Sequence, residues 1–197
     1  VGVAGTERTI PTREFTLDAV DGLQLPSSGC GQLVGSDEQG QAIAARIVGT
    51  GIASVYIAAE IYVAQQVIFR ALAIGARALV RTDRPHAWEM MVSTIASPDR
   101  LHVAGETNIS DAGYNVIVID GVEAPDPHAG ITTIYLTGDP DDWPVARPDV
   151  WIHQPGAYGR RITLSTGSNE VDLDLVTIPR ETAFIGRARG TQALASA

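Results

Sequence analysis

Residues 52–60 read IASVYIAAE, and this stretch decides the fold. Its first seven residues form a nearly continuous apolar run, which is typical of a strand that is covered on both faces. From Ile61 to Leu72 apolar residues recur at helical spacing, which predicts a helix over about 60–73 with one face in the core. A buried strand that leads directly into an amphipathic helix is the first half of a βαβ unit.

The same alternation continues to residue 104. A second strand is predicted over 77–81, and a second helix starts near Pro85 and ends before Pro98. The strand 101–104 closes the unit. Crossovers between parallel strands need a helix of about this length, so residues 52–104 predict a βαβαβ unit with a parallel sheet.

The remainder of the chain is rich in strands. Expected strands are 14–20, 32–36, 41–48, 115–119, 131–136 and 150–153, with a hairpin of 161–165 and 170–177. The sequence therefore predicts an α/β fold with a mostly parallel central sheet, a strand-rich second half and a peripheral antiparallel hairpin. No linker divides the chain, so we expect one soluble domain over 1–190 and a frayed tail over 191–197.

The turn between the first strand and helix, residues 57–60, reads IAAE and contains no glycine. A dinucleotide or phosphate loop needs glycines here, so that backbone N–H groups can approach the phosphate closely. The Glu60 carboxylate also places negative charge where an anion requires positive potential. The sequence thus predicts a nucleotide-binding type of fold without its phosphate site, which favours docking over catalysis at this turn.

Composition narrows the classes of partner. The 197 residues carry a net charge of −9, which disfavours nucleic acid and anionic lipid as partners. No apolar stretch is long enough to cross a membrane, so membrane contact is expected only through segments absent from this chain. The first residue, Val1, is consistent with a piece of a longer protein.

One motif suggests metal chemistry. Asp139 and Asp141 flank Pro140 at the end of an expected strand, and such a pair can hold a divalent cation that bridges a nucleotide diphosphate. A metal-dependent nucleotide-sugar transferase uses this device. The alternative is a proline turn capped by aspartates, since Asp172 and Asp174 repeat the spacing on the polar face of a strand.

Other motifs give no catalytic constellation. Gly29, Gly31 and Gly35 follow a loop and not a strand, which favours a turn over a cofactor loop. The four histidines lie on different elements, and Cys30, the only cysteine, has no evident base. We therefore predict no catalytic residue, no cofactor and no resident metal.

The turn after the second strand is the best-placed candidate for a partner contact. Arg84, His86 and Trp88 lie at the carboxyl end of a strand, where ligands of open α/β sheets bind, and Arg and Trp are typical interface anchors. The alternative is a helix start with a buried tryptophan. Trp143 and Trp151 could add to an exposed aromatic patch or belong to the core.

The segments that carry these features also resemble a known family. VYIAAEIYVAQQ (55–66), GARALVRTDRPHAW (75–88) and PDRL (98–101) resemble the soluble domain of EccE, a component of the mycobacterial type VII (ESX) secretion membrane complex. The resemblance is strongest over 52–104.

The resemblance implies a fold similar to a glycosyltransferase without the catalytic equipment. It implies two transmembrane helices before this segment and a position on the cytosolic side of the inner membrane. It also implies contacts with the other core components EccB, EccC and EccD. The leading hypothesis is a non-catalytic assembly domain of this secretion complex, and the alternative is the transferase that uses Asp139 and Asp141.

Overall fold

A computed structural model describes residues 31–95, 97–105, 109–124, 128–139, 147–156 and 159–186. The strands in these ranges are β1 (Gln32–Ser36), β2 (Ala42–Ala45), β3 (Ser54–Ala58), β4 (Ala78–Thr82), β5 (Leu101–Ala104), β6 (Val116–Asp120), β7 (Thr132–Thr137), β8 (Val150–His153), β9 (Arg161–Thr166) and β10 (Asn169–Leu175). The helical segments are α2 (Ile61–Ala73), the 3-10 turn η1 (Pro85–Trp88), α3 (Glu89–Thr94) and α4 (Pro179–Ile185).

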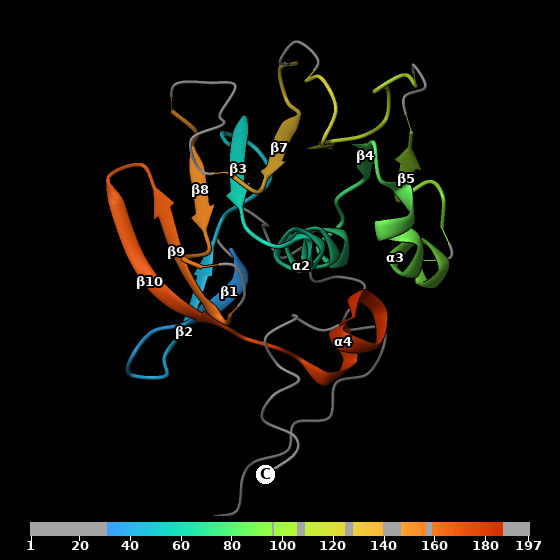
Figure 1. The fold of residues 1–197 in the computed structure, drawn as a ribbon. Coiled ribbons are helices and arrows are strands. Elements are labelled where there is room, and N and C mark those ends of the chain that lie inside the picture. Colours follow the sequence, from blue (N-terminus) through green and yellow to red (C-terminus); the bar gives the residue numbers. More distant parts are fainter. Residues whose placement is uncertain are drawn as a thin grey trace, which may run out of the picture.

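The strands form one mixed sheet in the order β2-β1-β10-β9-β8-β3-β7-β6-β4-β5 (Figure 1). The pairings from β8 to β5 are all parallel, and those from β8 to β2 are all antiparallel. The predicted α/β class with a mostly parallel central sheet is confirmed. The predicted hairpin is also present as β9 and β10, but it belongs to a larger antiparallel wing completed by β1 and β2.

The strands of the 52–104 unit are not all neighbours. β4 and β5 pair directly, whereas β7 and β6 lie between β3 and β4. The connection through α2 therefore crosses two strand positions that are filled by later parts of the chain. Local sequence predicts each strand, but it carries no signal for these insertions.

The central helix α2 is buried on most sides. Ten of its 13 residues are buried, and its apolar residues join the main core with the strand residues of one sheet face. Figure 1 shows α2 in the middle of the fold, with α3 beside it and α4 below it. After α2, Gly75 adopts a φ of 102°, a left-handed conformation that glycine reaches without the steric cost of a side chain.

Burial of α2 takes polar side chains out of water, and two of them, Arg70 and Gln66, are paired with distant segments. Arg70 is only 8% exposed, and its Nε and Nη2 donate to the two carboxylate oxygens of Glu181 at 2.8 and 2.7 Å. Arg70 also donates to the carbonyls of Leu33 and Val176. Gln66 donates to Val176 and Glu181 as well. This cluster fastens α4 and β1 onto α2.

The second predicted helix differs from expectation. It is a 3-10 turn followed by the short helix α3, with Pro85 in the first turn as predicted. The short helix α4 was not predicted. The expected strand 14–20, the loop that holds Cys30 and the tail 191–197 lie outside the described residues.

Loss of the Arg70–Glu181 pair should strongly destabilise the domain. We expect Glu181→Ala to lower the free energy of unfolding by about 3–5 kcal/mol, because it leaves a buried guanidinium without its counter-charge. Urea denaturation followed by circular dichroism measures this change.

The exposed pair of Arg161 and Glu38 provides the control, since half or more of each side chain is exposed. Arg161→Ala should leave the midpoint almost unchanged. Equal effects of the two substitutions would contradict a structural role for the buried pair.

Candidate site at the carboxyl edge of the sheet

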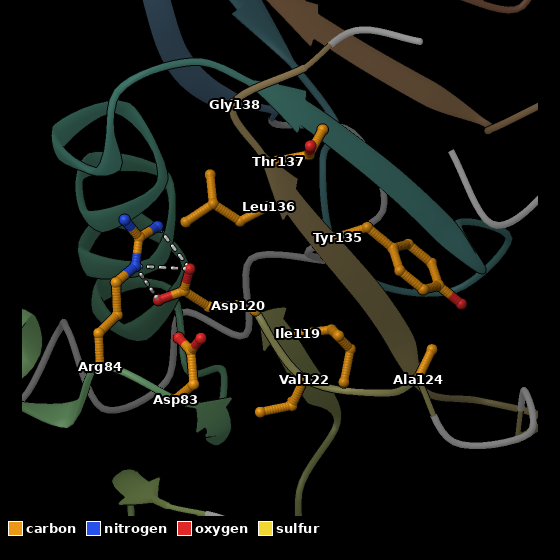
Figure 2. Close-up of a pocket in the computed structure, with 11 residues that line it drawn as sticks. Asp83, Arg84, Ile119, Asp120, Val122, Ala124, Tyr135, Leu136, Thr137 and Gly138 are labelled. Atoms are coloured by element: carbon orange, nitrogen blue, oxygen red, sulfur yellow. Dashed lines mark hydrogen bonds and ion pairs between the residues drawn. The ribbon is translucent and has the colours of Figure 1, made fainter. Parts of the chain in front are cut away.

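A pocket of about 600 Å³ opens at the carboxyl ends of β6 and β7 and at the turn that follows β4. Figure 2 shows its walls. The lining residues are Asp83, Arg84, Ile119, Asp120, Gly121, Val122, Ala124, Tyr135, Leu136, Thr137 and Gly138. Its volume lies within the range of small-molecule sites.

The topology explains why a pocket forms here. From β4 the chain continues outward to β5, whereas from β6 it continues in the opposite direction to β7. Because β4 and β6 are parallel neighbours, their outgoing connections diverge and leave a crevice beyond their carboxyl ends. The pocket therefore lies at the position where open α/β sheets bind ligands.

Asp120 organises one wall of the pocket. Its carboxylate is 1% exposed and accepts hydrogen bonds from Thr82 Oγ1 at 2.8 Å and from Trp88 Nε1 at 3.0 Å. Arg84 adds Nε at 3.0 Å and Nη2 at 2.5 Å to the oxygen Oδ1. The aspartate thus joins β6 to the end of β4 and to η1, and its oxygens are already engaged by protein donors.

Arg84 lies at the rim, with its side chain 46% exposed. The hydrogen bonds to Asp120 hold the pKa of its guanidinium above the ordinary value. Arg84 therefore stays positively charged, and its charge is largely balanced by Asp120.

Asp83 brings a second carboxylate into the pocket. A side-chain carbon on Gly121, whose φ is 76°, would lie 2.4 Å from Asp83 Oδ1. Glycine at this position therefore allows the Asp83 carboxylate to lie directly against the turn after β6. Figure 2 shows this carboxylate beneath the Arg84–Asp120 pair.

The opposite part of the pocket is apolar. Ile119 and Tyr135 are register partners on β6 and β7, so both point to the sheet face away from Asp120 and Leu136. Tyr135 packs edge-on against Tyr56, with the ring centroids 5.1 Å apart. Burial raises the pKa of the Tyr135 phenol, so the group is neutral at physiological pH.

The phosphate position of nucleotide-binding folds, at the start of α2, is closed. The backbone N–H of Glu60 donates to Gln154 Oε1 at 2.9 Å. Gln154 is 5% exposed, and its Nε2 donates back to Glu60 at 3.4 Å and to the Gly159 carbonyl at 2.8 Å. A side-chain amide from the end of β8 therefore engages the backbone donor that a phosphate would need, beside the Glu60 carboxylate.

The aspartates of the predicted metal motif fall at the limit of the described residues. Asp139 follows Gly138, a lining residue, and its backbone N–H donates to Thr137 Oγ1 at 3.1 Å. Asp141 lies outside the described residues. Within the ranges that the structure describes, no three His, Cys, Asp or Glu side chains gather into a metal-binding group.

The residues predicted to contact a partner separate into different environments. Arg84 and His86 are exposed, but Trp88 is fully buried and bound to Asp120, which corrects its placement in a partner surface. Trp151 is half-buried and stacks on His153, with ring centroids 5.5 Å apart. Trp143 lies outside the described residues.

Sequence reasoning missed Asp120 and Gln154. An aspartate that ends the apolar run VIVID and precedes a glycine is a signal for a residue at the carboxyl edge of a buried strand. Gln154 carries no comparable signal, because its partner Glu60 is 94 residues away.

Comparisons with known proteins give no further guide to the family. No protein-family model, curated protein or solved structure matches this chain. In the described part of the chain, no helix has both the length and the apolar character needed to cross a membrane. The fold and the pocket define an α/β domain with an open mixed sheet and a cavity at its topological switch point.

Asp120 should be essential to the integrity of the site. Asp120→Ala leaves the buried Trp88 N–H and Thr82 hydroxyl without their acceptor, and each such loss costs about 1–3 kcal/mol. We expect a fall of about 3–5 kcal/mol in the free energy of unfolding, together with a change in near-UV circular dichroism as Trp88 loses its fixed environment.

Asp172 provides the control, because it is an exposed aspartate on β10 whose carboxylate accepts a hydrogen bond from the Thr163 hydroxyl. Asp172→Ala should leave the near-UV spectrum unchanged. An Asp120→Ala domain with native stability and spectrum would show that Asp120 does not hold the site together.

Proposed function

We propose that this domain is a non-catalytic assembly domain of a type VII (ESX) secretion membrane complex. It would dock onto other core components, EccB, EccC and EccD, from the cytosolic side of the inner membrane. The proposal begins from the resemblance of residues 52–104 to the soluble domain of EccE. Physical support comes from two polar groups, the Glu60 amide and the Asp120 carboxylate, which are both engaged by other protein groups.

The observation that carries the non-catalytic part is the closure of the α2 N-terminus. Gln154 engages the Glu60 amide, and the adjacent carboxylate repels anions. A phosphate would have to displace a 95%-buried side chain and then lie beside a negative charge. Asp120, the most buried carboxylate of the pocket, is already saturated by Arg84, Thr82 and Trp88 and is a poor base or metal ligand.

The segment after β4 supplies the surface that best suits docking. Arg84 and His86 are exposed, and Met90 on α3 is 54% exposed. We call these three residues the η1–α3 surface. It combines a guanidinium, an imidazole and an apolar side chain, which is the mixture found at protein interfaces.

Two carboxylates introduced into the η1–α3 surface should weaken assembly. We expect the variant that carries both Met90→Asp and His86→Asp to co-purify with EccB, EccC and EccD about tenfold less than the native chain, or weaker still. A loss of this size is typical when a central interface contact is removed. The measurement is affinity purification of the complex from detergent-solubilised membranes, with quantification of each component.

Ile74, which is 62% exposed at the end of α2, provides a matched control. Ile74→Asp should co-purify as the native chain does. Undiminished assembly in the double variant, with the domain folded, would contradict docking through the η1–α3 surface.

A second candidate function is the nucleotide-sugar transferase, and the position of Asp139 beside the pocket favours it. The two proposals differ in a titration. For the assembly domain we expect no metal-dependent binding of uridine, guanosine or adenosine diphosphate sugars in the presence of Mn²⁺ or Mg²⁺. Micromolar, metal-dependent binding that is lost in the Asp139→Ala, Asp141→Ala double variant would overturn the scaffold-only reading and favour the transferase.

A further inference from the structure

The pocket at the carboxyl edge is lined by more carboxylates than cations. Such a lining suits a ligand that donates hydrogen bonds and disfavours an anion. Its lining contains two carboxylates, Asp83 and Asp120, and one guanidinium, Arg84, so its formal charge is −1. Arg84 already makes three hydrogen bonds to Asp120. Among the described lining residues, a phosphate would therefore meet a guanidinium that is already paired with Asp120, and it would face the Asp83 carboxylate.

The polar end of the pocket presents acceptors. Asp83 lies against Gly121, and a carboxylate has two oxygens that can accept hydrogen bonds from two adjacent hydroxyl or amino groups. Thr137 lies on the same face of β7 as Tyr135, and its hydroxyl donates to the Asp139 carbonyl at 3.2 Å. A ligand that fits this end carries hydrogen-bond donors.

The other end of the pocket is lined by apolar side chains. Val122 and Ala124 supply half-buried aliphatic surface, and Ile119 and Tyr135, which are 5% and 6% exposed, complete this end, with the Tyr135 ring packed against Tyr56. The two ends lie on opposite faces of the same strand ends, as Figure 2 shows for Leu136 and Tyr135. A ligand must therefore reach over the edge of the sheet, with donors at one end and a ring at the other.

From this geometry we infer that the pocket binds an uncharged heteroaromatic molecule with a vicinal pair of hydroxyls, namely a nucleoside without its phosphates. The base packs on Ile119, Val122 and Tyr135, and the ribose hydroxyls donate to Asp83. The volume of about 600 Å³ accommodates a molecule of this size. Such binding requires no metal and does not depend on the assembly role proposed above.

The test is calorimetric titration of the folded domain with adenosine, guanosine, uridine and cytidine, and with the matching 5′-diphosphates. We expect at least one nucleoside to bind saturably, its diphosphate to bind more weakly, and EDTA to have no effect. Asp83→Ala should weaken the nucleoside by about tenfold or more, since a hydrogen bond to a charged group is lost.

Two further variants keep the test sharp. Ala124→Phe fills the apolar end and should also weaken binding, whereas Asp174→Ala changes an exposed aspartate on β10, far along the sheet, and should leave the dissociation constant unchanged. Absence of saturable binding by all four nucleosides, an unchanged constant in Asp83→Ala, or tighter binding of the diphosphate would each overturn the inference. Metal-dependent binding of nucleotide sugars would depend on Asp139 and Asp141, so it tests the transferase alternative and not the nucleoside site.

Discussion

The fold depends on one constraint, the burial of α2 on nearly all sides. A fully apolar helix in this position would need only side chains that pack well against it. Helix α2 instead carries Arg70 and Gln66 into the interior, where an unpaired polar group is costly. Their partners are the Glu181 carboxylate and backbone carbonyls that include Val176. These hydrogen bonds join α2 to β1, to the chain after β10 and to α4. The same cluster therefore holds the antiparallel wing and α4 against the helix that covers the parallel sheet.

A second buried carboxylate plays the corresponding part at the carboxyl edge. Asp120 ties β6 to the end of β4 through Thr82, Arg84 and Trp88. The chain leaves β4 and β6 in opposite directions, so the crevice between them is a product of topology, and Asp120 sets its polar wall. The same hydrogen bonds pair Asp120 with Arg84, the guanidinium among the described residues that line the pocket.

Much of the local structure could be predicted from the sequence, and the site only in part. The apolar run before Glu60 and the helical periodicity after it predicted β3 and α2, because both are properties of neighbouring residues. The sequence predicts Arg84 and Asp139 at strand ends, and the structure puts Arg84 in the pocket wall and Asp139 one residue beyond the lining. Trp88 was assigned to a possible surface and is buried, since its environment is set by Asp120, 32 residues further along the chain.

The sequence by itself determined the α/β class, the strands and the first helix of residues 52–104, and the lack of a glycine phosphate loop, since each depends on residues close together in the chain. Only the tertiary structure decided that β7 and β6 separate β3 from β4, that Gln154 closes the start of α2, and that Asp83 shares a pocket with Tyr135. The reason is physical: strand order and hydrogen-bond partners across dozens of residues are selected by the burial of the whole sheet, and no local pattern encodes that choice.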